Sequence, residues 1–190
     1  MPSPAVLSTS PIVARVRTFQ IHRDGAVLAG LIALAFGVNI IGPMVIGAEY
    51  IDDVALALTL GMLWGVVVAP LHHEVAHALV ARHCRIEVIG SGYSARRAYV
   101  LFRPPVMGVT VRQWISTFAA GPASNAVVGS TALASWVVFA RASVSDGGLF
   151  VLVVALSELL LCLTSAVPLS DSDGQKISLL LRLARSPVVL

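Results

Sequence analysis

The sequence predicts an all-α polytopic membrane protein with about four transmembrane helices, a small β-rich segment between the second and third, and a broken fourth helix. One observation behind this is composition: 57% of the 190 residues are hydrophobic and 12% are charged, roughly half the charged fraction of an average chain. A second is the presence of apolar stretches long enough to cross a bilayer as helices, at residues 25–48, 54–82, 114–140 and 149–167.

The third observation is the placement of the cationic residues. With four spans, twelve of the 13 Lys and Arg residues fall on one side of the membrane and only Arg141 falls on the other. The positive-inside rule makes the crowded side cytoplasmic. Both termini and the connection at residues 84–113 are therefore expected on that side, in a multi-pass protein of a prokaryotic cytoplasmic membrane. The sequence encodes no basic, aromatic-rich soluble surface, which argues against nucleic acid as a partner.

These features divide the chain into three regions. Residues 1–24 are polar and contain three prolines, so we expect a flexible cytoplasmic N-terminus. Residues 25–174 form the four-span domain, with its core at residues 54–174. Residues 175–190 are mainly apolar, with basic side chains at Lys176, Arg182 and Arg185, and predict an amphipathic or half-spanning helix.

Two short stretches of the connection, residues 85–89 and 98–102, are rich in β-forming side chains and predict a pair of short strands. Such a pair would lie against the membrane surface, either as a plain hairpin or as an open edge that receives an unwound substrate. In the second span, Gly61 and Gly65 either allow close helix packing or are simply tolerated there. Pro70 favours a kink in the same helix.

A His-Glu-x-x-His pattern lies in the second span, at His73, Glu74 and His77. Residues four apart share one face of a helix, so both imidazoles can bind a single metal ion. Two neutral imidazoles suit zinc, and a catalytic zinc site keeps one position for a water whose proton Glu74 can accept. The alternative is an amphipathic helix with surface histidines, but the flanking residues are apolar, and ionisable groups in such a setting indicate function.

A catalytic zinc site normally has a third protein ligand. Residues 168–174 contain Pro and Gly and break the fourth span at the expected depth of the motif, where irregular backbone is tolerated if it lines a cavity. Asp171 or Asp173 can therefore supply the third ligand, although an ordinary polar loop end has the same composition. Four other ionisable residues are poorer candidates because of their helix face, surface position or depth: His72, His83, Glu87 and Glu158.

Three motifs, taken in order, resemble those of the site-2 protease family of intramembrane zinc metalloproteases: His73-Glu74-Val75-Ala76-His77, Gly121-Pro122-x-x-Asn125, and Pro168 followed by Asp173-Gly174. The resemblance covers residues 54–174 and implies a minimal form without a PDZ or sensor domain. It implies a single zinc ion, a general base, a polar side chain near the site and a fallback ligand. By this resemblance, the zinc ligands would be His73, His77 and Asp173, and the base would be Glu74. Asn125 would lie near the site, and Asp171 would be the fallback ligand.

The chain departs from this family pattern at three positions. Ser165 stands where the family usually has an asparagine that helps to hold the substrate or the oxyanion, so we expect Ser165 to contact substrate or to support the ligands. Ala76 replaces the glycine that often precedes the second histidine. Ser172 replaces the usual leucine before Asp-Gly.

The resemblance implies hydrolysis of peptide bonds in membrane-embedded or hydrophobic peptide substrates. The expected partners are such a substrate and the lipid bilayer. Ser165 leaves open an alternative, a catalytically weak or inactive homologue that binds membrane proteins, although the intact Glu74 argues against it. A metal transporter that uses His73, His77 and Glu158 is disfavoured because the sequence shows no internal repeat.

Overall fold

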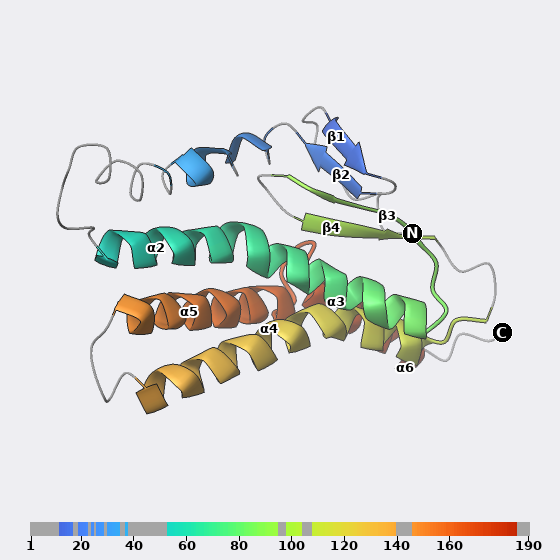
Figure 1. Ribbon diagram of the computed structural model, residues 1–190. Helices are drawn as coiled ribbons and strands as arrows, with labels where there is room; N and C mark the ends of the chain where they lie inside the picture. The colour runs from blue at the N-terminus through green and yellow to red at the C-terminus, as the bar shows by residue number, and fades with distance from the viewer. Residues whose placement is uncertain are drawn as a thin grey trace.

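The computed structural model (Figure 1) describes residues 12–16, 19–22, 24, 26–28, 30–34, 37, 53–94, 98–103, 108–139 and 146–185. Its labelled helices are α2 (Asp53–Leu63), the π-helical segment η1 (Trp64–Val68), α3 (Ala69–His83), α4 (Val111–Phe139), α5 (Asp146–Ala166) and α6 (Asp173–Arg185). Its strands are β1 (Ile12–Val16), β2 (Phe19–His22), β3 (Val88–Tyr93) and β4 (Ala98–Phe102).

The helices pack together, and the sheet lies along one side of them (Figure 1). Elements α2, η1 and α3 follow one another without a break. Helix α5 packs against α2 and α4, while α4 also packs against α3 and α6. The sheet contacts α3 through β3 and β4, on the side away from α4 and α5 (Figure 1). Helix α3, which carries the His-Glu-x-x-His motif, is therefore enclosed by helices on one side and by the sheet on the other.

Small residues bring α2 and η1 close to α5. A Cβ added at Gly61 would lie 2.8 Å from Cβ of Val153, and one added at Gly65 would lie 2.8 Å from Oγ of Ser157. Neither distance is tolerable between real carbon or oxygen atoms, so both glycines are required for this approach. The packing interpretation of the Gly61 and Gly65 pair is thereby confirmed.

The second predicted helix changes geometry just before Pro70. Residues Trp64–Val68 form a π-helical turn, in which the backbone N–H of Ala69 bonds to the carbonyl of Trp64. Pro70 has no N–H, so the carbonyl four residues earlier loses its usual helical partner. That carbonyl belongs to Val66, and it accepts a hydrogen bond from the hydroxyl of Tyr93 at 2.9 Å. The widened turn thus fixes strand β3 to the helix close to the motif.

The described strands form a four-stranded sheet in the order β1–β2–β3–β4. Strands β3 and β4 pair antiparallel, which confirms the predicted pair, but β3 begins later than expected and extends to Tyr93. The reason is local: Arg85 has a positive φ of 60° and ends the helix first. A side chain at Gly92 would collide with Tyr99 and with the backbone of Gln20, so glycine permits neighbours on both sides.

Two strands lie within residues 1–24, the region expected to be a flexible N-terminus. Strand β1 pairs antiparallel with β2, and β2 pairs parallel with β3, with Phe19 opposite Ser91. The prolines and hydroxyl residues of this region suggested a linker, but three of the five residues of Ile12–Val16 are β-branched, and such side chains favour strands. The remaining positions of that region lie mostly outside the described residues.

Within the described residues, two helices are long and apolar enough to cross a membrane: Leu56–His83, with 28 residues, and Gly147–Ala166, with 20. Helix α4 is longer, at 29 residues, but it is more polar and includes Pro122. The predicted first span at residues 25–48 falls mostly outside the described residues, although the described positions between 24 and 37 are helical. The count of four spans, and with it the three-region division, stays a prediction.

The fourth predicted helix is broken, as α5 ends at Ala166 and α6 begins at Asp173. Ser172, a departure from the family pattern, caps α6: its hydroxyl accepts the backbone N–H of Gln175 at 3.1 Å. A Cβ on Gly174 would collide with the backbone of Ala166. Glycine therefore lets the first turn of α6 fold back against the end of α5. The C-terminal helix starts two residues before the predicted boundary and extends to Arg185.

Candidate metal centre

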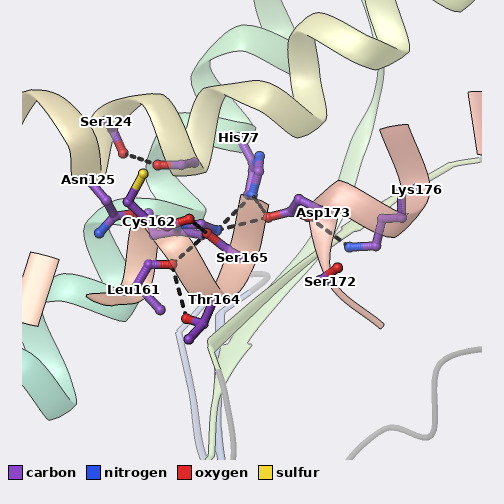
Figure 2. Close-up of polar contacts among 12 residues, drawn as sticks. His77, Ser124, Asn125, Leu161, Cys162, Thr164, Ser165, Ser172, Asp173 and Lys176 are labelled. Atoms are coloured by element: carbon purple, nitrogen blue, oxygen red, sulfur yellow. Dashed lines mark hydrogen bonds and ion pairs between the residues drawn. The ribbon is translucent and has the colours of Figure 1, made fainter. Parts of the chain in front are cut away.

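Three buried donor atoms converge where α3 meets the first turn of α6. Oδ2 of Asp173 lies 3.0 Å from Nε2 of His73 and 3.1 Å from Nε2 of His77. The two imidazole nitrogens lie 3.1 Å from each other. Figure 2 shows the carboxylate of Asp173 pointing at His77, with Lys176 on its other side. The helical spacing of the histidines supplies two donors, and the helix break 100 residues further along the chain supplies the third.

The spacing of these donors fits a tetrahedral zinc ion. Ligand atoms at about 2.0–2.1 Å from zinc are roughly 3.3 Å apart at the corners of a tetrahedron, close to the distances observed. Space for an ion is also present, because Gly121 on α4 faces both imidazoles and a Cβ at that position would collide with Nε2 of each. Two nitrogens and one carboxylate oxygen form a donor set that zinc prefers.

Glu74 lies beside these donors. Its carboxylate and the donor nitrogens of His73 and His77 all lie within 4.8 Å of one another. These three residues alone could hold an ion, yet Asp173 brings its oxygen to 3.0–3.1 Å from both imidazoles. We therefore consider Asp173 the better third donor and Glu74 a side chain at the distance suited to an intervening water.

Partners at the second ring nitrogens fix the orientation of both imidazoles. Nδ1 of His77 donates to the backbone carbonyl of Thr117 at 2.6 Å. Nδ1 of His73 contacts Oδ1 of Asn125. A proton on Nδ1 leaves Nε2 with a free lone pair, which is the arrangement found in metal-bound histidines. Thr117 contributes only its backbone, so no side-chain pattern in the sequence could have identified it.

Asp173 is also held from the side opposite the histidines. Nζ of Lys176 lies 2.9 Å from Oδ1 and 5.0 Å from the ring centre of Phe118. Burial raises the pKa of Asp173, but the adjacent imidazole rings and the charge of Lys176 lower it more, so the pKa lies below its usual value. Lys176 thus places a positive charge beside the carboxylate, on the side away from the imidazoles. The i, i+3 spacing of Asp173 and Lys176 in the sequence could have predicted this ion pair.

A cavity of about 240 Å³ adjoins the donors. Side chains from α3, including Glu74, line one side, and strand β4 lines another. The last turn of α5 contributes Ser165, and the segment that joins α5 to α6 contributes Asp171. The hydroxyl of Ser165 donates back to the carbonyl of Leu161 at 2.6 Å (Figure 2). The cavity thus connects the proposed base and ligands with a strand.

The other residues considered as ligands lie elsewhere. His83 is exposed, and Glu87 forms a surface ion pair with Arg103 at 2.7 Å. Asp171, the fallback, is exposed and borders the cavity, but it is not one of the three converged donors. His72 faces away from those donors, with Nδ1 at 3.5 Å from Oε1 of Glu158.

A second buried cluster lies behind the donors and was not anticipated. Glu158 on α5 is fully buried, and its Oε1 accepts the indole N–H of Trp64 at 2.7 Å. Its Oε2 accepts the amide N–H of Asn125, whose oxygen in turn contacts His73. The sequence placed Glu158 too far away to act as a ligand, and the structure agrees with that. Its link to the site runs through Asn125, whose family motif was the available signal.

The helical fold, the two helices of spanning length and the converged donors indicate a membrane protein with a candidate metal centre at a helix break. The chain is similar in structure to a solved protein described as a site-2 protease from Methanocaldococcus jannaschii. The match has a TM-score of 0.57 and 17% sequence identity, and it covers 93% of this chain and 73% of that one. The fold is therefore site-2 protease-like. No family model and no curated protein matches the chain.

Proposed function

We propose that this protein is an intramembrane zinc metalloprotease that hydrolyses peptide bonds of membrane-embedded or hydrophobic peptide substrates. His73, His77 and Asp173 would hold one zinc ion. The observation that carries the proposal is the convergence of two imidazole nitrogens and a carboxylate oxygen within 3.0–3.1 Å of one another. The carboxylate belongs to Asp173, which follows His73 by 100 residues and His77 by 96. The similarity of fold to a described site-2 protease supports it.

The residues around the donors have distinct roles in hydrolysis. When bound, zinc supplies a positive centre that acidifies water and polarises a peptide carbonyl. Glu74 accepts the proton of the attacking water and delivers it to the leaving amine. The carbonyl of Thr117 and the amide of Asn125 keep the two imidazoles oriented throughout. Burial of these groups strengthens each electrostatic interaction relative to water.

Strand β4 is the proposed docking site for substrate. It is one of the two outer strands of the described sheet, and it lines the same cavity as Glu74. A transmembrane helix hides its carbonyls in its own hydrogen bonds, so a segment must unwind before cleavage. An unwound segment can pair with the free edge of β4 and so extend towards the donors. This favours a receiving edge over a plain surface hairpin.

Removal of metal is expected to abolish cleavage reversibly. The substrate would be a single-span helix with a helix-weakening segment, reconstituted with the protein in liposomes. Treatment with 1,10-phenanthroline should stop cleavage, and added Zn²⁺ should restore it while Mg²⁺ should not, because nitrogen donors select zinc. Cleavage that persists in the chelated protein, and is no higher in the parent than in an Asp173→Ala variant, would contradict the proposal.

Ser165 is expected to limit the rate. Its hydroxyl proton is committed to the carbonyl of Leu161, so it offers no donor to a substrate carbonyl in the cavity. A Ser165→Asn variant would add an amide donor there, and we expect kcat/KM for peptide cleavage to rise by about 10-fold, the equivalent of one hydrogen bond of ~1.4 kcal/mol. A matched Thr164→Asn change on the exposed side of the same helix should leave kcat/KM unchanged. A fall on Ser165→Asn would contradict this assignment.

A further inference from the structure

The buried carboxylate of Glu158 needs an explanation that hydrolysis does not give. Glu158 is fully buried in a helix of spanning length and does not line the cavity beside the donors. An ionisable group in an apolar helix is costly unless it is paired, and it normally has a function. Here the carboxylate accepts one hydrogen bond at each oxygen, from Trp64 and from Asn125.

The directions of these hydrogen bonds are fixed by chemistry. An indole N–H can only donate, so the oxygen of residue 158 that faces Trp64 must accept. The other oxygen accepts from the NH₂ group of Asn125, and this turns the amide oxygen of Asn125 towards Nδ1 of His73. An amide oxygen can only accept, so Nδ1 of His73 carries its proton. Nε2 then presents a lone pair towards the position shared with His77 and Asp173.

We propose that Glu158 is a positioning residue that sets the amide orientation of Asn125 and, through it, the metal-binding tautomer of His73. This inference rests on the proposed metal centre, because a tautomer matters only if His73 is a ligand. Trp64 contributes to this positioning. Its indole N–H donates to one oxygen of residue 158 and so determines which group of that residue faces Asn125. Four residues from η1, α3, α4 and α5 thereby act as one chain.

The first variant is Glu158→Gln, which keeps the shape of the side chain. Trp64 still requires an acceptor, so the glutamine oxygen remains towards the indole and its NH₂ faces Asn125. The Asn125 amide must then rotate and turn its own NH₂ towards His73. That arrangement requires an unprotonated Nδ1 and moves the proton to Nε2. We expect zinc affinity to fall by about 10–100-fold, the usual range for a lost outer partner of a metal-bound histidine.

The second variant exchanges the two functional groups, as Glu158→Gln together with Asn125→Asp. The glutamine NH₂ now donates to one oxygen of the aspartate, and the other oxygen accepts from Nδ1 of His73. Zinc affinity, measured by competition with a chromophoric chelator in detergent, should return to within about threefold of the parent, less than the 10–100-fold loss of the single change. If Glu158 served only packing, the second substitution would add to the loss and would not reverse it.

A metal-free measurement separates this inference from the proposed function. His77→Ala and Asp173→Ala together remove the two groups within hydrogen-bond distance of Nε2 of His73, while Glu74 stays the same in every sample. In that background, at about pH 9, where imidazoles are normally neutral, the ¹⁵N shifts of His73 report its tautomer directly. We expect the proton on Nδ1 in the background, on Nε2 after Glu158→Gln, and on Nδ1 again after the exchange.

The outcomes distinguish a failure of the proposed function from a failure of this inference. A protein that binds no zinc and cuts no substrate would overturn the proposed function, and the ¹⁵N spectra would still decide the role of Glu158. Spectra in which the proton of His73 lies on Nδ1, then on Nε2, then on Nδ1 again across the three samples support the inference. A tautomer of His73 that is the same in all three samples, or an exchange variant that binds zinc no better than Glu158→Gln alone, would overturn it.

Discussion

Replacement of Glu74 by Gln is expected to reduce peptide cleavage by roughly 10²–10⁴-fold, the contribution typical of a general base, while zinc content stays at one ion per chain. Glutamine keeps the shape of the side chain but cannot accept a proton. The three donors that lie 3.0–3.1 Å apart do not include Glu74. Elemental analysis of the purified variant and initial cleavage rates in liposomes are the two measurements.

Glu87→Gln is the matched control for this experiment. It removes a carboxylate that pairs with Arg103 at the surface, so it should change neither cleavage nor zinc content. A Glu74→Gln variant that cleaves at the rate of the parent would show that Glu74 is not the general base. A variant that loses its zinc would instead make Glu74 a ligand, which its place within 4.8 Å of His73 and His77 permits.

Gly121→Ala is expected to have the second large effect, a loss of zinc affinity of more than about 100-fold, beyond the usual range for changes around a metal ligand. The added methyl group would collide with Nε2 of both His73 and His77. It would therefore occupy the space where the ion has to bind. Chelator competition measures the affinity, and thermal unfolding in detergent reports whether the fold survives.

Overpacking alone must be distinguished from obstruction of the metal. Gly61→Ala serves this purpose, because its methyl group would collide with Val153 in the α2–α5 contact, on a different helix from Gly121. Overpacking typically costs about 1–3 kcal/mol of stability, so both variants should be destabilised. Only Gly121→Ala should lose zinc. Equal zinc affinity in the two variants would contradict the assignment of Gly121.

Local sequence patterns predicted the parts of the site that depend on one helix or one break. The four-residue spacing of His73 and His77 sufficed to place both imidazoles on one face, because helical geometry alone determines that. Asp173 required more: the break after α5 left Asp171 and Asp173 equal, and the resemblance to a family separated them. The Ser172-x-x-Gln175 pattern, a recognised helix start, could have located the beginning of α6.

Other features depend on contacts between distant segments, and no local sequence pattern indicates them. Strand β2 pairs with β3 some 72 residues later, at Phe19 and Ser91, and only the tertiary fold brings the two together. The contact of Trp64 with Glu158 spans 94 residues. A glutamate within an apolar span indicates that a polar partner exists, but it does not identify the partner residue.

The most direct test of the metal centre is an anomalous-difference map of the zinc-loaded protein at the zinc absorption edge. We expect one peak per chain, within bonding distance, at about 2.0–2.2 Å, of Nε2 of His73, Nε2 of His77 and a carboxylate oxygen of Asp173. A peak elsewhere, or both Asp173 and Asp171 beyond bonding distance of the ion held by the two histidines, would contradict the proposed protease.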